Sequence, residues 1–410
     1  MVLSRPIPPD IIREIVNELP FNRTFLLQSS TISRAFAFVC QCRLFETVGI
    51  GSSKGRERCQ QLHRLLTDSP HLARLIHNLT LQNRAIKIST LYGGQERAEW
   101  FLVEATLPLL LDMLPALKSV QLKSSTIATY WSDLPHELQT SLLRVFSLPS
   151  LTAIGFSDII APANVLSHSA NLAKLDLHHS KIVDGMEGWS SSSLIGDEAV
   201  KPPLQILSAR YGMPSLRVLK SALDITRLRE FILADEPNCD QHMAELLRCS
   251  RESLERFTWV QPHICVHTCD PNSALTSHLR FLEVIFQGFL VDEPSSPLTW
   301  TLHALRALST CRTGSVDLEE LTIRTTVSWV RAMLTYQSTS WATFDAILGE
   351  QDVFVKLRHV RIVLYGLHDY RNDFDISKTY IEGDMSRIGD LGILSIENAH
   401  RPFAEHHNSD

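Results

Sequence analysis

The sequence lacks any uninterrupted apolar run long enough to cross a bilayer. Its most apolar stretch, residues 100–117, is broken by Glu104, Pro108, Asp112 and Pro115, whereas a membrane-spanning helix needs about 20 mostly apolar residues. The opening residues, MVLSRPIPPD, lack the apolar segment of a secretory signal peptide. We therefore expect a soluble protein of the cytoplasm or nucleus, with no membrane partner.

A strong excess of charge of either sign is also absent. Lys and Arg number 39 and Asp and Glu 45, which gives a net charge of −6. No basic stripe with interleaved aromatic residues is present, so nucleic acid is not an expected partner. The 8 cysteines are scattered rather than set at the short spacings of a disulfide framework, which favours reduced thiols. The apolar share of 44% excludes a wholly disordered chain.

Complete signatures of catalysis or phosphate binding are missing as well. The segment Gly51-Ser52-Ser53-Lys54-Gly55 matches G-x-S-x-G, the pattern around a hydrolase nucleophile. Helices are predicted before it, however, where that fold needs several strands, and no GK[ST] follows. We interpret the segment as a Gly/Ser loop, and a serine hydrolase using Ser53 stays a minor alternative.

One run of metal-binding residue types stands out. His263, Cys265, His267 and Cys269 would share one face of an extended strand, and their side chains suit zinc. Adjacent ligands on one straight strand do not surround a tetrahedral ion, and zinc sites usually draw ligands from two elements. We predict no metal site, no cofactor and no catalytic residue, and a metal-dependent enzyme is the other minor alternative.

What is present begins with a helical N-terminus. Pro8, Pro9 and Asp10 indicate a helix start, because proline suits the first turn and a carboxylate complements the helix dipole. An apolar stripe at helical spacing follows over residues 11–19. Two further short helices are predicted around residues 25–32 and 36–44. Three short helices bury little surface by themselves, so this module needs a neighbour or a partner.

These residues resemble an F-box. Residues 7–19 (IPPDIIREIVNEL) resemble its opening, a Leu-Pro-x-Glu/Asp-Ile pattern followed by an amphipathic helix. Residues 32–36 (ISRAF) resemble the second signature, Val-Ser/Cys-Arg-x-Trp, and residues 44–48 (LFETV) resemble the closing Leu-Phe-x-x-Val. The resemblance implies a three-helix F-box over residues 1–50 that docks on a Skp-family adaptor of a cullin ubiquitin ligase.

The implied adaptor-binding residues are the apolar positions of this module, some of which must instead pack its helices together. Phe36 stands where a Trp is usual, and Ser29 and Thr31 stand where apolar residues are common. The candidate adaptor-binding residues are Ile7, Pro8, Ile11, Ile12, Ile15, Leu19, Leu26, Leu27, Ile32 and Phe36.

The rest of the chain repeats the motif apolar-x-x-apolar-x-apolar. Its last two apolar positions are two residues apart, so they point to one face of a short strand. Stacked strands of this kind bury each other's apolar side chains. The copies are Ile76-Leu79-Leu81, Leu117-Val120-Leu122, Leu151-Ile154-Phe156, Leu172-Leu175-Leu177, Leu228-Phe231-Leu233, Leu254-Phe257-Trp259, Leu279-Leu282-Val284, Leu318-Leu321-Ile323 and Leu357-Val360-Ile362.

This pattern resembles an irregular leucine-rich-repeat-like solenoid. Only some spacings between copies, such as the step from Leu151 to Leu172, fall within the 20–29 residues of true leucine-rich repeats. Longer spacings need inserted helices or hide a degenerate repeat such as Leu216-Leu219. The Asn that usually follows the strand is missing. Segments between copies predict helices, for example Arg56–Leu66, Glu96–Leu114 and Gln241–Cys249, and alternating strands and helices predict an α/β fold with a parallel sheet.

We expect a domain organisation in which this α/β solenoid occupies residues 51–365. The Gly- and Ser-rich segment 185–203 is a predicted loop or linker, and residues 292–297 form a shorter break. The repeat fades after Gly366, so residues 366–410 are predicted as an acidic capping segment and tail.

The resemblance implies that the protein is the target-recognition subunit of an SCF-type cullin ubiquitin ligase and not itself an enzyme. Its partners would be the Skp-family adaptor, the cullin and a protein target. A repeat scaffold that acts without ubiquitin ligase is the alternative. Strand residues that flank the inward apolar pair face the open side of the sheet. The resulting target-binding candidates are Lys174, Asp176, His178, Glu230, Arg256, Thr258, Glu283, Glu320, Arg324, His359 and Arg361.

Overall fold

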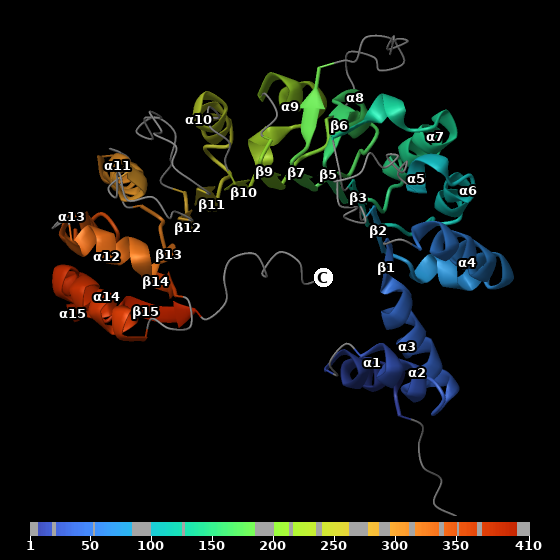
Figure 1. Ribbon diagram of the computed structural model, residues 1–410, viewed down its shortest axis with the longest axis horizontal. Helices are drawn as coiled ribbons and strands as arrows, with labels where there is room; N and C mark the ends of the chain where they lie inside the picture. Colours follow the sequence, from blue (N-terminus) through green and yellow to red (C-terminus); the bar gives the residue numbers. More distant parts are fainter. Residues whose placement is uncertain are drawn as a thin grey trace, which may run out of the picture. The chain divides into compact units, whose positions relative to one another are not determined.

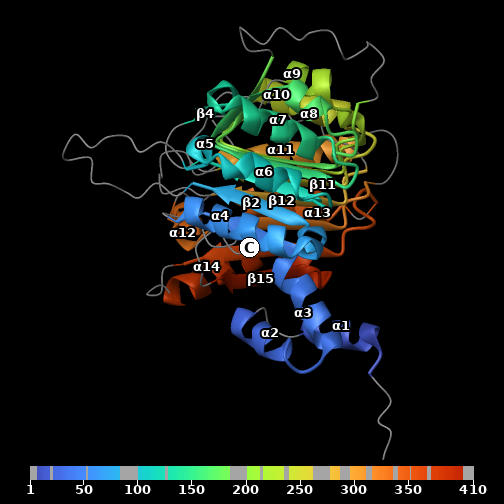
Figure 2. The same cartoon turned by 90° about the vertical axis from the view of Figure 1, so that its right-hand side faces the viewer.

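The computed structural model shows an α/β protein in which strands of parallel sheet alternate with helices (Figures 1 and 2). The chain divides into two compact units, Met1–Pro202 and Pro203–Asp410. None of the described helices has the length and apolar character that a bilayer crossing requires. The structure describes residues 7–18, 22–51, 54–83, 100–124, 128–184, 201–212, 216–234, 240–261, 278–286, 296–310, 316–335, 340–350, 352–366 and 371–399.

The first unit opens with three helices, as the sequence predicts: α1 (Pro9–Glu18), α2 (Arg23–Ser29) and α3 (Arg34–Glu46). Polar residues cap two of them, because Asn22 Oδ1 accepts a hydrogen bond from Phe25 N (3.2 Å) and Ser33 Oγ accepts one from Phe36 N (3.3 Å). We call α1–α3 the helical module. Its core consists of Ile12, Val16, Leu26, Val39 and Cys40.

A parallel sheet follows the helical module. Strands β1 (Thr47–Ile50), β2 (Asn78–Gln82), β3 (Ser119–Lys123), β5 (Ala153–Ser157) and β7 (Lys174–His178) pair in that order. Because β1 pairs with β2, the sheet begins at Thr47, inside the segment 1–50 that the sequence assigns to the helices. The other helices here are α4 (Gly55–Asp68), η1 (Pro70–Leu75), α5 (Trp100–Val103), α6 (Thr106–Asp112), η2 (Trp131–Asp133), α7 (His136–Phe146) and α8 (Asn164–Ser167).

A second, smaller parallel sheet in this unit escapes the sequence pattern. It consists of β4 (Thr129–Tyr130), β6 (Ile159–Pro162) and β8 (Lys181–Val183). The chain turns into β6 and β8 through Asp158 (φ 57°) and His179 (φ 49°). The buried hydroxyl of Ser180 accepts a hydrogen bond from Ile159 N and donates one to His178 O. A serine thus satisfies backbone groups in a turn where the sequence offers no Asn.

The parallel strands of the second unit pair in chain order and are β9 (Ile206–Arg210), β10 (Glu230–Ala234), β11 (Arg256–Gln261), β12 (Phe281–Phe286), β13 (Glu320–Thr326), β14 (His359–Tyr365) and β15 (Leu394–Ala399). Its helices are α9 (Leu216–Ala222), η3 (Ile225–Arg227), α10 (Asp240–Cys249), α11 (Ser296–Thr310), α12 (Val327–Thr335), α13 (Ser340–Leu348), α14 (Arg371–Asp384) and α15 (Ser386–Asp390).

All copies of the repeated motif lead into strands, as predicted. The two inward apolar residues of each copy are no more than 6% exposed. Leu357, the first apolar position of the last copy, is half-buried, whereas its counterparts are buried. The same backbone contact recurs where consecutive strands begin: a carbonyl just before one strand accepts hydrogen bonds from two successive N–H groups at the start of the next strand. Lys118 O accepts from Thr152 N and Ala153 N, and Glu255 O accepts from Arg280 N and Phe281 N.

The degenerate repeat predicted at Leu216-Leu219 is wrong. Those residues lie in α9, and the missing strand is β9. Its motif is Leu204-x-x-Leu207-x-Ala209, with all three apolar residues fully buried. The sequence pattern misses it because a small alanine takes the last position.

The segment after residue 366 is more than a cap and tail. Residues 371–399 contain α14, α15 and β15, and β15 pairs with β14 in parallel register. The alternation of helix and strand therefore continues past the predicted end of the repeats. Residues 400–410 lie outside the described residues.

The predicted inter-repeat helices are largely confirmed. Residues 56–66 lie in α4 and residues 241–249 in α10. The helix predicted over residues 96–114 is interrupted at Glu104, between α5 and α6. The carboxylate of Glu104 accepts a hydrogen bond from Thr106 N (3.0 Å), at the first residue of α6. Residues 96–99 are outside the described residues. Of the predicted breaks, residues 185–200 and 292–295 are also outside them.

Candidate partner-binding surfaces

The helical module exposes large apolar side chains on its outside. Ile11 and Ile15 are each 42% exposed on α1, while Ile12 and Val16, which face the module core, are at most 2% exposed. Because Ile11 and Ile15 are four residues apart, their side chains lie on the same side of α1. We call the exposed residues the apolar surface of the helical module: Ile7, Ile11, Ile15, Phe25, Leu27, Ile32 and Phe38.

The structure divides the adaptor-binding candidates by burial. Ile7, Pro8, Ile11, Ile15, Leu27 and Ile32 are exposed, and Phe36 is half-buried against the module core. Ile12 and Leu26 were predicted to bind the adaptor, but they lie in the module core, where α1 and α2 pack against α3. Leu19 lies outside the described residues.

Two exposed residues of this surface, Phe25 and Phe38, were not among the candidates. Phe38 is 55% exposed on α3, two residues from half-buried Phe36. The sequence signal was available, since an apolar residue off the buried stripe of a helix faces outward. Exposed aromatic rings give a contact surface a large apolar area at a small cost in side-chain entropy.

The two sites where the F-box resemblance departs from its usual apolar residues differ in their surroundings. Ser29 is buried at the end of α2. Thr31 donates a hydrogen bond from Oγ1 to Gln28 O (2.7 Å) and so ends α2 rather than facing the core.

In the first unit, the target-binding candidates lie together on β7. Lys174, Asp176 and His178 alternate with the fully buried Leu175 and Leu177, so they lie on the opposite side of the sheet, which we call the open face. The strand paired with β7, β5, contributes small uncharged residues in register with them, for example Gly155 beside Asp176. The open face of this unit therefore carries its charges mainly at one strand.

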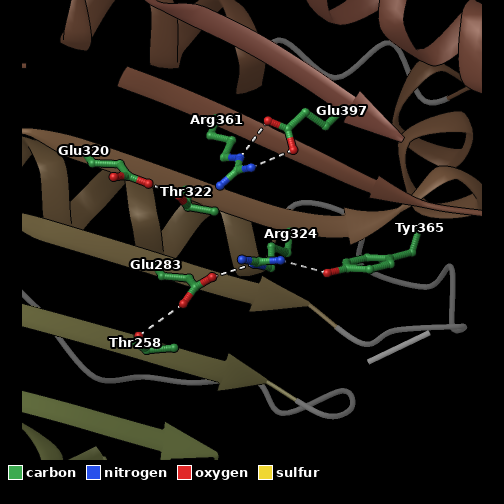
Figure 3. Close-up of polar contacts among 8 residues, drawn as sticks. All are labelled: Thr258, Glu283, Glu320, Thr322, Arg324, Arg361, Tyr365 and Glu397. Atoms are coloured by element: carbon green, nitrogen blue, oxygen red, sulfur yellow. Dashed lines mark hydrogen bonds and ion pairs between the residues drawn. The ribbon is translucent and has the colours of Figure 1, made fainter. Parts of the chain in front are cut away.

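In the second unit, polar contacts among eight residues lie on the open face of β11 to β15, and together we call these contacts the polar network (Figure 3). Glu283 Oε2 accepts a hydrogen bond from Thr258 Oγ1 (3.3 Å), and its other oxygen forms an ion pair with Arg324. Arg324 Nη1 donates to the hydroxyl of Tyr365 (3.0 Å). Four strands thus share one connected set of polar contacts.

A second pair in Figure 3 links β14 to β15. Arg361 Nε and Nη2 donate to Glu397 Oε1 and Oε2 at 2.8 and 2.9 Å, the bidentate geometry of a guanidinium and a carboxylate. The bond to Glu397 raises the pKa of Arg361 above its ordinary value, against a smaller effect of burial. Glu320 accepts a hydrogen bond from Thr322 (3.1 Å) beside this pair.

The remaining target-binding candidates on this open face differ in how far their side chains are exposed to solvent. Arg256 is exposed, and its guanidinium lies 4.3 Å from the ring centroid of Phe281 on the next strand. Glu230 is half-buried and His359 exposed. Thr258 was predicted to contact a target, but it is only 7% exposed and its hydroxyl bonds to Glu283, so it positions that carboxylate instead.

The network includes Thr322, Tyr365 and Glu397, which were not predicted. Thr322 is in register with Glu283 on one side and Arg361 on the other, so strand alignment alone could have found it. Glu397 lies in the segment predicted as an acidic tail, and no motif marks its strand. Tyr365 lies beyond the apolar pair that defines the motif.

The two minor enzyme hypotheses receive no support from the described residues. Ser53 and the run His263 to Cys269 lie outside them, and no group of three or more His, Cys, Asp or Glu within the described part of the chain could hold a metal ion. The glycine that ends the G-x-S-x-G motif has a packing role, since a Cβ on Gly55 would lie 2.6 Å from the indole ring of Trp100.

Comparisons with known proteins do not assign a family to these surfaces. No family model matches the chain, and no curated protein matches it. The functional interpretation therefore depends on the sequence motifs and on the geometry described above.

Proposed function

We propose that this protein is the target-recognition subunit of an SCF-type cullin ubiquitin ligase. In this proposal the helical module is an F-box that binds a Skp-family adaptor, and the strand–helix repeats form a leucine-rich-repeat-like solenoid that binds the protein to be modified. The protein itself catalyses no reaction. It raises the rate of transfer by holding a target lysine close to the activated ubiquitin.

The observation that carries the proposal is the apolar surface of the helical module. Ile11, Ile15 and Ile32 are 42%, 42% and 66% exposed, although the module already has a closed core of its own. A small module that exposes several large apolar side chains is typical of a site of protein–protein contact. The position of Ile11 and Ile15 on the amphipathic helix that follows the Pro8-Pro9-Asp10 opening fits the F-box resemblance.

The open faces supply the second part of the proposal. Strands of both units present charged and polar side chains there, while their apolar pairs are buried on the other side. A face with charges of both signs suits a polar protein surface better than an apolar ligand.

Affinity purification from cells tests adaptor binding. The full chain should recover a Skp-family adaptor and a cullin, and the double variant Ile11→Asp with Ile15→Asp should lose both. The matched control is Leu334→Asp with Val355→Asp, two residues that are likewise exposed (40% and 66%) but lie in the second unit. Circular dichroism should show that both variants keep the helix content of the parent chain.

A repeat scaffold that works without ubiquitin ligase is the competing function. It predicts that the parent chain recovers neither adaptor nor cullin. Equal recovery of the adaptor by the parent and the Ile11/Ile15 variant would instead place the docking surface elsewhere.

A further inference from the structure

The last strand of the second unit has an open hydrogen-bonding edge. Among the described residues, β15 pairs with β14 alone. Val360 N donates to Ile393 O (2.8 Å), and Val360 is in register with Leu394. In a parallel ladder a residue bonds to the two neighbours of its register partner, so successive residues of β15 alternate in direction. Ile393, Ser395 and Glu397 therefore turn their backbone groups toward β14, and Leu394, Ile396 and Asn398 turn theirs toward the open edge.

The apolar residues at this edge are more exposed than those of the strands inside the sheet. Leu394 and Ile396 are half-buried, whereas Val360 and Ile362 at the equivalent positions of β14 are fully buried. Leu391, just before the strand, is 43% exposed. The terminal repeat thus lacks the neighbour that buries the inward residues of every other repeat in this sheet.

The sequence of β15, LSIENA, carries none of the usual protection of an edge strand. It contains neither proline nor lysine, the residues that commonly block pairing at a sheet edge. Its one charge, Glu397, is bound by Arg361 through two hydrogen bonds. That ion pair offsets the repulsion that a second carboxylate nearby would cause.

We propose that β15 pairs antiparallel with β15 of a second copy of this chain, about a two-fold axis at Ile396. In this register Ile396 lies opposite itself, Leu394 lies opposite Asn398, and Ser395 lies opposite Glu397. The residues opposite one another at Leu394, Ile396 and Asn398 are those whose N–H and C=O groups point to the edge, so each can exchange both hydrogen bonds with its counterpart. If the two strands were shifted by one residue, inward-facing side chains of one copy would lie opposite outward-facing side chains of the other. The N–H and C=O groups that point to the edge would then no longer face each other.

The geometry also matches the symmetry of the interface. A two-fold axis perpendicular to the sheet makes the contact isologous and closed, so it produces a dimer and not a filament. The half-buried Ile396 would then be covered by Ile396 of the other copy, and Leu394 would lie beside Asn398 of the other copy. This inference concerns a different surface from the helical module and does not depend on adaptor binding.

Analytical ultracentrifugation of the full chain over the micromolar range tests the dimer. The parent protein should sediment as a dimer, and Ile396→Lys, which places like charges opposite each other, should weaken association at least tenfold. Asn398→Pro removes an N–H that points to the open edge without removing a bond to β14, so it should have the same effect if Ile396→Lys disturbs folding. A parent chain that is monomeric throughout, or dimers that persist in both variants, overturns the proposal.

Disulfide crosslinking tests the register. Residues that form a hydrogen-bonded antiparallel pair have Cα atoms about 5.5 Å apart, within the range that a disulfide bridges. Under mild oxidation, Ile396→Cys should give a crosslinked dimer on non-reducing gels, above the background from the native cysteines in the parent chain. Ser395→Cys, which faces Glu397 of the other copy, should not. Equal crosslinking by both variants contradicts the proposed register.

Discussion

The indole ring of Trp100 lies where a side chain on Gly55 would otherwise be. A Cβ at Gly55 would lie 2.6 Å from ring atoms of Trp100, and the indole N–H donates to Gln82 O (3.1 Å). Trp100 thereby joins the start of α4, the end of β2 and α5. The glycine that looks like part of a hydrolase motif in the sequence is required by this packing.

Replacing Gly55 by alanine should therefore destabilise the first unit. The rigid indole has to move to admit the new methyl group, and overpacking of this kind costs about 1–3 kcal/mol. Gly49→Ala is the matched control, because a Cβ there meets no atom within 4 Å. Urea unfolding should give a lower midpoint for Gly55→Ala than for Gly49→Ala. Equal midpoints would show that Trp100 adjusts freely.

Neighbouring isoleucines of α1 should differ in their effect on stability. Ile12→Ala opens a cavity in the helical module and should cost about 2–5 kcal/mol, since Ile12 is only 2% exposed. Ile11→Ala removes atoms that already face solvent and should change stability by less than about 0.5 kcal/mol. Hydrogen exchange of α1–α3 measures both. Similar losses of protection would mean that Ile11 also packs within the module.

The stability of the first unit should depend on pH through Glu104. Burial by itself raises the pKa of this carboxyl, but hydrogen bonds from Thr106 and Gln60 and the charge of Arg56 outweigh it and hold the pKa below its ordinary value. A carboxyl whose pKa is lower in the folded state stabilises the fold above its unfolded pKa, and that contribution disappears as the pH falls through the folded pKa.

Glu104→Gln should accordingly be less stable than the parent at neutral pH. The amide replaces a carboxylate that accepts several hydrogen bonds, and leaving buried donors without an acceptor costs about 1–3 kcal/mol. The difference should narrow in acid, once the parent carboxyl is protonated. Glu137→Gln, at an exposed position on α7, is the control. A constant difference between parent and Glu104→Gln across pH would show that the charge of Glu104 contributes nothing.

The polar network of the second unit should couple Tyr365 to Arg324. Tyr365→Phe removes the hydroxyl that accepts a bond from Arg324, at an expected cost of about 0.5–1.5 kcal/mol. In a double-mutant cycle with Arg324→Met, the two losses should be less than additive. The cycle of Tyr365→Phe with Arg361→Met is the comparison, because Arg361 bonds to Glu397 instead. Equal coupling in both cycles would contradict the pairing seen in Figure 3.

Charge reversal on β7 tests target recognition by the open face of the first unit. Lys174→Glu with Asp176→Lys should reduce recovery of target proteins in quantitative mass spectrometry severalfold, while recovery of the adaptor stays unchanged. Thermal unfolding should remain within a few degrees of the parent, since the alternating apolar residues of β7 are untouched. Unchanged recovery of targets would assign recognition to another surface.

The sequence-based repeat prediction succeeded wherever large apolar residues fill both inward positions. It failed at β9, where the apolar residue at the last position is the small Ala209. It also failed at β15, whose Leu394 and Ile396 lie in the segment that was predicted as an acidic cap and tail because the repeat fades after Gly366. It also missed the sheet β4–β6–β8, because strands of two to four residues leave too few positions to show a period.

Spacing alone determined that the chain alternates strands with helices and that Leu175 and Leu177 face away from Lys174, Asp176 and His178. These are local properties, set by the two-residue period of a strand and the 3.6-residue period of a helix. Only the tertiary structure decided that Ile12 is core while Ile11 is surface. It also decided that Thr258 supports Glu283, that Arg361 binds Glu397, and that β15 pairs with β14 alone among the described residues. Each of these features depends on which segments far apart in the sequence come into contact. The free energy of burial and of ion pairing depends on those contacts, which the local sequence pattern does not specify.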